Sequence, residues 1–325
     1  MTKRDPKIHL FYRDEQVIHK ANGYSMSPLK PRLLLQHLVK NELNNQFIIH
    51  KGWKPFNRED FLVAHTPRYV NSFFDGVNPL ASSNGLIWNK EFADTVRYTN
   101  SSLYHAMKYA VENPQRITFS PTSGFHHAQP QQGSGFCTFS GQVIASMKLY
   151  NEKKLVGSYI DLDGHFGNSI EDSREYIPEL DKAIPEDCNI NPHGRHAAYL
   201  SDLDGKLQVL ENKLLRGKVH YVVFAHGADS HEDDSLGYQV NTKEWLLASR
   251  MVYSMVKRVS EKLGRCIPLT LSLFGGYRHD DYDSVLNLHT GDLVTCLNIM
   301  CNKKIDFLVK VKPSRGRKTK QMSEV

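Results

Sequence analysis

The stretch Ser158-Tyr-Ile-Asp-Leu-Asp-Gly-His-Phe-Gly-Asn168 decides how this chain is interpreted. It begins as a short apolar run typical of a β-strand and then brings Asp161, Asp163 and His165 in succession. Alternate side chains of an extended segment share one face, so we expect these three to project the same way. Carboxylates and an imidazole at the end of a strand are typical ligands of a divalent metal ion. The alternative is an Asp-rich turn, because Asp, Gly and Asn are common turn residues.

The composition is that of an ordinary globular protein of 325 residues with a formal net charge of +6. Its five cysteines are scattered and form no C-x-x-C pair: they are Cys137, Cys188, Cys266, Cys296 and Cys301. Neither a disulfide framework nor a thiolate zinc site is therefore expected, which favours a reducing compartment. The chain has no apolar run of signal-peptide or membrane-spanning length, so we expect a cytoplasmic protein without a membrane partner.

The end of the chain is basic, with Lys310, Lys312, Arg315, Arg317, Lys318 and Lys320 close together. Such a segment can touch nucleic acid weakly, but it is more often a solvated, disordered end. We expect one catalytic domain over residues 1–311 and a disordered tail over 312–325. No internal repeat or linker suggests a second domain.

Strands and helices are expected to alternate along the chain. The predicted strands cover residues 7–12, 46–50, 116–120, the segment from 158, 186–191, 220–225, 267–274 and 306–311. The predicted helices cover 33–43, 57–63, 67–74, 94–111, 141–151, 203–215, 242–263 and 283–288, with Asn57 as an N-cap and Gly264 as a helix stop. This order predicts an α/β fold: a single domain with a mostly parallel multi-stranded sheet flanked by helices on both faces.

Polar residues follow four of these strands. They are His126 and His127; Asp161, Asp163 and His165; His226, Asp229, His231, Asp233 and Asp234; and Gly275, Gly276 and Tyr277. Ligands of an open parallel sheet bind outside the carboxyl ends of its strands. Each group taken alone could be ordinary turn, surface or packing residues. Together, however, the four groups predict a functional site at one edge of the sheet.

Several motifs carry a resemblance to a known family. They are Gly124-Phe-His-His-Ala128, Gly135-Phe-Cys137, Asp161-Leu-Asp-Gly-His165, Gly227-Ala-Asp-Ser230, Asp234-Ser-Leu-Gly237 and Gly275-Gly-Tyr277. In order and spacing, the sequence resembles the histone deacetylase family of the arginase/deacetylase superfamily, over nearly the whole chain from Ser27. The resemblance implies an arginase/deacetylase-like fold.

The resemblance also implies that Asp163, His165 and Asp229 hold one Zn²⁺ ion, leaving positions open for chemistry. The segment Asp229-Ser-His-Glu-Asp233 offers an alternative, because D-x-H-x-D also occurs in binuclear manganese arginases. We assign His231 and Asp233 to solvent or to positions behind the ligands, and a second metal ion stays an alternative.

The family's tandem histidines correspond to His126 and His127. By resemblance, His127 takes a proton from the attacking water and His126 tunes the site. Asp161 resembles the buried carboxylate that orients His126. Asn168 stands where many members carry Asp behind His127, so we expect His127 to be less basic than in those members. Tyr277 matches the tyrosine that donates a hydrogen bond to the developing oxyanion.

Other positions are carried over in the same way. Gly135 and Phe136 are expected to line the channel that grips the lysine methylenes. Arg32 resembles an arginine of an internal channel behind the metal, although a surface arginine at a helix start is the alternative. Asp161 and neighbouring carbonyls resemble a site for a monovalent cation such as K⁺.

Two departures from the family pattern are Phe166, in place of a second histidine, and Phe274, in place of Gly or Glu. Both are expected to pack in the core. The segment 189–196 matches the family loop poorly, so the outer wall of the channel is left open.

The function expected from the resemblance is zinc-dependent hydrolysis of acetyl or related acyl groups from lysine side chains of proteins or peptides. The main alternative is an amidohydrolase acting on acetylpolyamines or other small acylated amines. Leu236 disfavours the polyamine reading, because some polyamine enzymes carry a glutamate there that would attract a second ammonium group. A silent acyl-lysine binder and an arginase-like ureohydrolase are the remaining alternatives.

Overall fold

The structure is a computed structural model that describes residues 3–19 and 24–314. Among these residues, seven parallel strands form one sheet in the order β2-β1-β3-β7-β6-β4-β5. The strands are β1 (Ile8–Phe11), β2 (Phe47–His50), β3 (Ile117–Ser120), β4 (Gly157–Asp161), β5 (Asn189–Ile190), β6 (Tyr221–His226) and β7 (Leu269–Leu273). The predicted α/β class and the mostly parallel sheet are confirmed.

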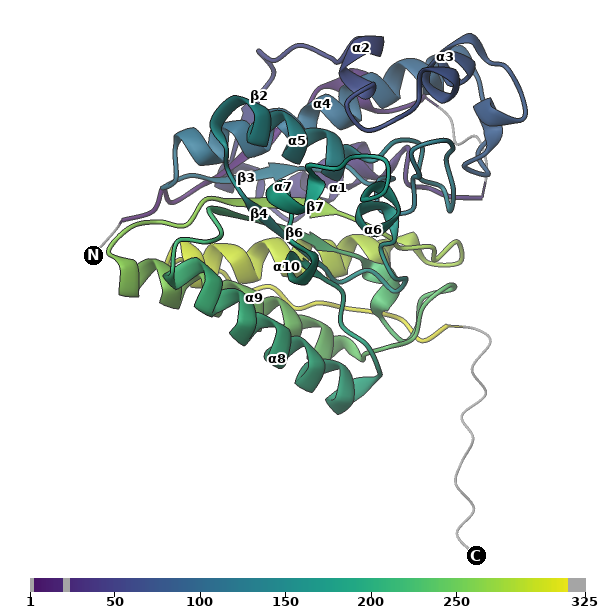
Figure 1. Cartoon of the computed structure of the whole chain (residues 1–325). Coiled ribbons are helices and arrows are strands. Elements are labelled where there is room, and N and C mark those ends of the chain that lie inside the picture. The colour runs from purple at the N-terminus through teal and green to yellow at the C-terminus, as the bar shows by residue number, and fades with distance from the viewer. Residues whose placement is uncertain (1–2, 20–23, 315–325) are drawn as a thin grey trace, which may run out of the picture.

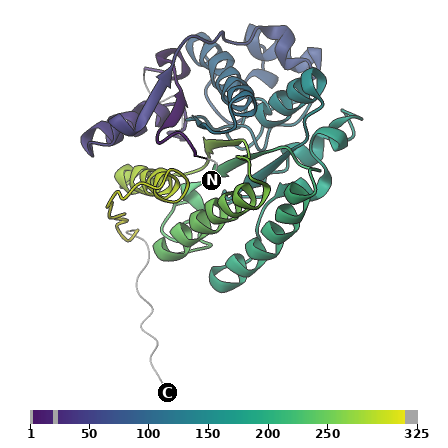
Figure 2. The same cartoon turned by 90° about the vertical axis from the view of Figure 1, so that its left-hand side faces the viewer.

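Helices cover both faces of the sheet. They are α1 (Lys30–Lys40), α2 (Arg58–Phe61), α3 (Pro67–Asp75), α4 (Lys90–Glu112), α5 (Gly141–Lys153), α6 (Ser169–Ser173), α7 (Leu180–Ala183), α8 (His196–Leu215), α9 (Thr242–Leu263) and α10 (Tyr282–Met300). Helices α4 and α5 lie on one side of the sheet, and α8, α9 and α10 lie on the other (Figure 1). The two helical layers are also visible in the view turned by 90° (Figure 2). Strands covered on both faces are mostly apolar, and β6 and β7 are fully buried.

The strands that carry the predicted site are neighbours. β3, β7, β6 and β4 occupy consecutive positions in the sheet and run in the same direction. Their carboxyl ends therefore meet at one edge, and the polar residues that follow them are brought together there. This arrangement is the geometric basis of the site.

Helix α9 shows how local sequence signals fix an element beside the site. Asn241 accepts from the N–H groups at the helix start, and the side chain of Glu244 accepts from the Asn241 N–H, which completes a capping box. Gly264 ends the helix in the left-handed conformation, with φ of 63°. In the first turn, the Trp245 indole donates to the Gly227 carbonyl at 3.0 Å. The start of α9 thus holds the loop that carries Asp229.

Some predicted elements are wrong. The helix expected over 283–288 extends to Met300, and the helix expected over 203–215 begins at His196. Residues 306–311 form no strand; they run as an extended segment that packs Phe307 and Val309 against the core. Only two residues of the predicted strand 186–191 pair with the sheet. Helices α6 and α7 were not predicted.

Residues 312–314 of the predicted tail contact the folded body: the Lys312 carbonyl accepts from Arg278 at 2.8 Å, and the Ser314 N–H donates to Asp233. The rest of that segment, residues 315–325, lies outside the described residues. Within the described part of the chain, no helix is both long and apolar enough to cross a membrane.

Candidate active site

Asp163, His165 and Asp229 form the centre of the site. Asp163 and His165 follow β4, and Asp229 follows β6, the neighbouring strand. His165 Nδ1 lies 3.1 Å from Asp163 Oδ1 and 3.0 Å from Asp229 Oδ2. One donor atom from each residue falls within 4.8 Å of the others. Three donors converging at such distances, with two carboxylates and one imidazole, fit a single divalent metal ion.

Glycines make room for the two carboxylates. A Cβ atom added to Gly275 or Gly227 would overlap the carboxylate of Asp229. The Gly275 N–H also donates to Asp163 Oδ2 at 2.7 Å. The carboxylates are therefore fixed from behind by a backbone that can approach only because these positions lack side chains.

The electrostatics of the group also fit a cation. Burial and the neighbouring charge of Asp163 raise the pKa of Asp229 to about 7. Hydrogen bonds to Asp163 and Asp229 raise the pKa of His165 to about 11. Two buried carboxylates this close together favour positive charge between them, which a metal ion supplies.

The two histidines after β3 lie side by side, with ring centroids 4.0 Å apart. His126 Nδ1 contacts Asp161 Oδ2 at 3.0 Å, and His127 Nδ1 contacts Asn168 Oδ1 at 2.7 Å. Burial lowers the pKa of His126, but the charges of Asp163 and Asp161 outweigh it and raise the value to about 9. Burial, together with the charge of His126, lowers the pKa of His127 to about 4. At neutral pH the pair therefore offers one cationic ring and one neutral ring.

Tyr277 follows β7 and closes the opposite side of the site. Its ring lies 6.3 Å from that of His165, and its side chain is only 8% exposed. Its backbone N–H donates to Asp234 Oδ2 at 2.8 Å. Burial raises the pKa of the Tyr277 hydroxyl well above its ordinary value, and nearby Asp163 adds to the effect. The phenol therefore stays protonated and can donate a hydrogen bond.

A narrow cavity opens beside these residues, with Gly135, Phe136 and Tyr277 in its lining. Gly135 has φ of +50°, and a Cβ there would contact the His127 ring at 2.6 Å. The Phe136 ring lies 5.7 Å from the Tyr277 ring and 6.1 Å from Tyr24 at the surface. Gly135 and Phe136 thus line a cavity beside the metal-binding group.

Lys30 is a residue of the site region that sequence reasoning missed. Its side chain is fully buried and donates to the carbonyls of Phe274 and Gly275, the latter at 3.1 Å. Burial lowers the pKa of Lys30 to about 8, against the opposing charges of Asp229 and Asp163. Arg32, which the resemblance assigned to an internal channel, is half-buried and donates to the Ile18 carbonyl at 3.2 Å.

One expectation about neighbouring residues needs correction, and another is narrowed. Phe166 does not pack in the core; its side chain is 50% exposed and its ring stacks on His193. Of the two expected locations for His231, in solvent or behind the ligands, burial excludes the first, and its ring pairs with Thr242 Oγ1 at 2.9 Å. Phe274 is buried as expected, with its ring 4.8 Å from that of His126.

Leu236 and Asp233 do not line the narrow cavity. Leu236 is 39% exposed, and its N–H donates to Asp234 Oδ1 at 3.0 Å. Asp233 accepts from the Ser314 N–H at 3.1 Å. Within the described part of the chain, neither Asp233 nor His231 joins the metal-binding group, so the geometry shows a single cluster of this kind.

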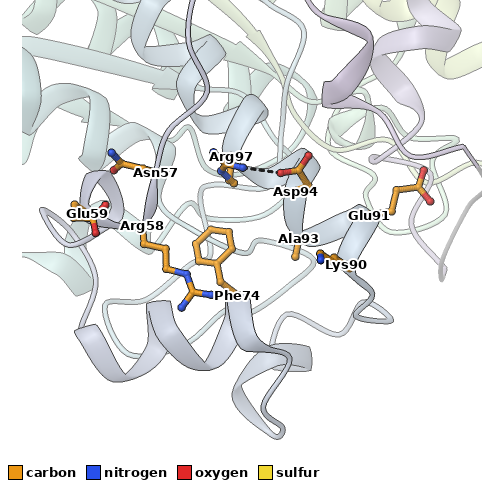
Figure 3. A pocket seen from close by; sticks show the side chains of 9 residues that line it. All are labelled: Asn57, Arg58, Glu59, Phe74, Lys90, Glu91, Ala93, Asp94 and Arg97. Atoms are coloured by element: carbon orange, nitrogen blue, oxygen red, sulfur yellow. Dashed lines mark hydrogen bonds and ion pairs between the residues drawn. The ribbon is translucent and has the colours of Figure 1, made fainter.

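A larger hollow of about 690 Å³ lies away from this site, between α2, α3 and the start of α4 (Figure 3). Its charged side chains are largely paired with each other or with close neighbours. Arg97 contacts Asp94 at 2.8 Å, and Arg58 contacts Asp75. The hollow contains no group resembling the converging donors of the metal-binding cluster.

Comparison with known proteins adds independent information. The family profile described as "Histone deacetylase domain" matches residues 24–180. An uncharacterized protein of Picosynechococcus sp. is 26% identical over 245 residues, which cover 69% of this chain and 77% of the relative. Histone deacetylase 2 of Arabidopsis thaliana is 25% identical over 271 residues, which cover 72% of this chain and 66% of the relative. Histone deacetylase 8 of Xenopus laevis is 34% identical over 137 residues, which cover 39% of this chain and 42% of the relative.

A solved structure supports the fold. The crystal structure of the HDA15 HD domain covers 91% of this chain and is itself covered to 90%, with a TM-score of 0.66 and 13% sequence identity. The single parallel sheet flanked by helices and this structural match show an arginase/deacetylase-like α/β fold. Together, the profile match, the relatives and the structural neighbour support the histone deacetylase family. This similarity supports a deacetylase activity in general.

Proposed function

We propose that this protein is a zinc-dependent deacetylase that hydrolyses acetyl or related acyl groups on lysine side chains. The observation that carries the proposal is the convergence of Asp163, His165 and Asp229 within 4.8 Å, next to the paired histidines and Tyr277. These three residues would hold the zinc ion. When bound, such an ion polarises an amide carbonyl and lowers the pKa of water towards ~7.

The protein's own side chains supply the proton transfers. His127 has a low pKa and is neutral at pH 7, so its Nε2 can take a proton from the attacking water and pass it to the leaving amine. His126 remains cationic and favours negative charge that develops nearby. The Tyr277 hydroxyl, protonated throughout the working range, donates to the carbonyl oxygen as it becomes an oxyanion.

An acylated lysine of a protein or peptide fits the site better than an acetylated polyamine. Phe136 and Gly135 offer an apolar lining for a methylene chain. The exposed Leu236 provides no carboxylate to attract a second ammonium group. Small acylated amines stay the alternative substrate class. A ureohydrolase is less favoured, because His231 and Asp233 do not join the metal-binding group.

We place the activity in the cytoplasm, since all five cysteines are free thiols and widely scattered, as in a reducing compartment. A structural monovalent cation such as K⁺ near Asp161 stays a prediction. So does a weak contact of nucleic acid with the basic end of the chain.

The test is turnover of acetyl-lysine peptides and acetylated polyamines side by side by purified, zinc-loaded protein. We expect turnover of the peptides that a chelator abolishes and added zinc restores. Preferential turnover of polyamines would overturn the substrate assignment. Activity that persists after complete removal of metal would overturn the mechanism.

Tyr277→Phe tests the role of the phenol. We expect kcat to fall by roughly 10²–10³-fold, because one oxyanion donor is lost. Zinc content and melting temperature should stay close to those of the parent. Tyr176→Phe, at an exposed tyrosine, is the matched control. A Tyr277→Phe variant as fast as the parent would exclude the oxyanion role.

A further inference from the structure

Asn168 stands behind His127, and the orientation of its side-chain amide has chemical consequences. The Asn168 oxygen accepts from His127 Nδ1 at 2.7 Å, and the Asn168 nitrogen donates to Asp172 Oδ2 at 2.5 Å. An amide has nearly the same shape when oxygen and nitrogen exchange places, so its hydrogen-bond partners decide its orientation. If the nitrogen faced His127, Nδ1 would have to accept and the ring proton would move to Nε2.

Asp172 is the partner that removes this ambiguity. An ionised carboxylate can only accept, so it selects the Asn168 nitrogen and leaves the Asn168 oxygen for His127. Helix α6 sets the distance, because the Asp172 N–H donates to the Asn168 carbonyl at 2.8 Å. Gln129 Nε2 donates to the same carboxylate oxygen at 3.1 Å, and Gln132 holds Gln129 at 3.0 Å. The exposed carboxylate is thereby kept beside Asn168.

We propose that Asp172 is a positioning residue that fixes the tautomer of His127 through Asn168. By accepting from the amide nitrogen, Asp172 keeps the amide oxygen towards His127, the ring proton on Nδ1, and Nε2 free to take a proton. The catalytic meaning of this relay rests on the proposed function. The amide orientation and the tautomer do not, because they are properties of the folded protein.

Asp172→Lys reverses the polarity of the relay. A lysine ammonium can only donate, so it attracts the Asn168 oxygen and turns the amide nitrogen towards His127. We expect the ¹⁵N chemical shifts of the His127 ring, measured by NMR on metal-free protein at pH 7, to show the proton moving to Nε2. In zinc-loaded protein we expect kcat to fall roughly 10–100-fold, with KM for an acetyl-lysine peptide little changed.

Two further variants make the test specific. Glu175→Lys produces the same change of charge at an exposed position three residues further on, and we expect the parent's tautomer and kcat. Asn168→Asp combined with Asp172→Lys supplies a carboxylate that accepts from both neighbours, and we expect it to restore the Nδ1 proton and part of the lost kcat. Melting temperatures check that every variant is folded.

The proposal is overturned if Asp172→Lys keeps the parent's His127 tautomer, or if Glu175→Lys loses as much activity. It is also overturned if the double variant leaves the proton on Nε2. A parent protein without deacetylase activity would contradict the proposed function, but the NMR measurements would still decide the role of Asp172.

Discussion

At the scale of single residues, His127 depends on a neutral partner, Asn168. Asn168 can hold the ring by a hydrogen bond, but it adds no negative charge to stabilise an imidazolium. Burial and the neighbouring charge of His126 then keep the pKa of His127 at about 4. The ring is therefore in its neutral, proton-accepting form at all pH values well above 4.

Asn168→Asp is expected to move the acid limb of the rate profile to higher pH. A carboxylate behind His127 stabilises the imidazolium and raises its pKa, so the basic form is lost at a higher pH as the pH falls. The measurement is kcat/KM for an acetyl-lysine peptide between pH 5 and 9, beside the parent. Superimposed profiles would mean that His127 is not the base whose titration limits the reaction.

Lys30 shows what residue-level reasoning can miss. The side chain of Lys30 lies on the same face of α1 as Leu34 and Leu38, at spacings of four and eight residues. This periodicity identifies the buried face of the helix and includes Lys30, whereas Arg32 falls off it. The signal was present in the sequence, but the resemblance directed attention to Arg32.

At the scale of elements, an ion-pair network joins α8 to α9. Glu211 on α8 contacts Arg258 Nε at 3.1 Å and Lys262 Nζ at 3.0 Å on α9. Hydrogen bonds from Arg258 and Lys262 lower the pKa of Glu211 to about 2. The carboxylate therefore adds stability above its unfolded pKa of about 4.3, and this stability is lost as the pH falls towards 2.

Glu211→Gln is expected to lower the free energy of unfolding by about 0.5–1 kcal/mol at pH 7, because the network is partly exposed. The difference from the parent should shrink below pH 4 and with added salt. Urea unfolding at several pH values measures it. Glu175→Gln, at an exposed glutamate outside this network, is the matched control for removing a carboxylate elsewhere on the surface. An equal loss in both variants, or one independent of pH, would contradict the role of the network.

At the scale of the whole molecule, the site joins loops from separate strands. The proposed ligands follow β4 and β6, and Tyr277 follows β7, so the site exists only when the sheet is assembled. A metal ion that binds this arrangement and not the unfolded chain stabilises the entire fold.

Zinc is therefore expected to raise the melting temperature of the parent protein. At 100 times its dissociation constant, the ion adds about 2.7 kcal/mol. Asp229→Asn should abolish this response. Without metal, the variant should melt no lower than the parent at pH 8. The reason is that the folded protein raises the pKa of Asp229 to about 7, so ionising this carboxyl group costs stability. That cost appears as the pH rises from about 4 through about 7, and the neutral amide of the variant does not have it. Differential scanning calorimetry with and without zinc provides the comparison, and equal stabilisation of both proteins would contradict the ligand assignment.

The sequence by itself determined the α/β class, the limits of α9 and the four strand ends where polar residues gather. Those features follow from local periodicity, caps and glycine stops, which act within a few residues. It did not determine the length of α10, because that helix is buried on most of its surface, polar residues included, and packs against α1 and α9.

Only the tertiary structure decided which polar side chains share the site. The burial of Lys30, the exposure of Phe166 and the contact of Asp172 with Asn168 all depend on segments that meet in space, or on turns too short to carry a periodic signal. Local sequence specifies where helices and strands begin and end. The approach of distant loops is set by the packed sheet and helices, and that approach gives each polar group its partner and its pKa.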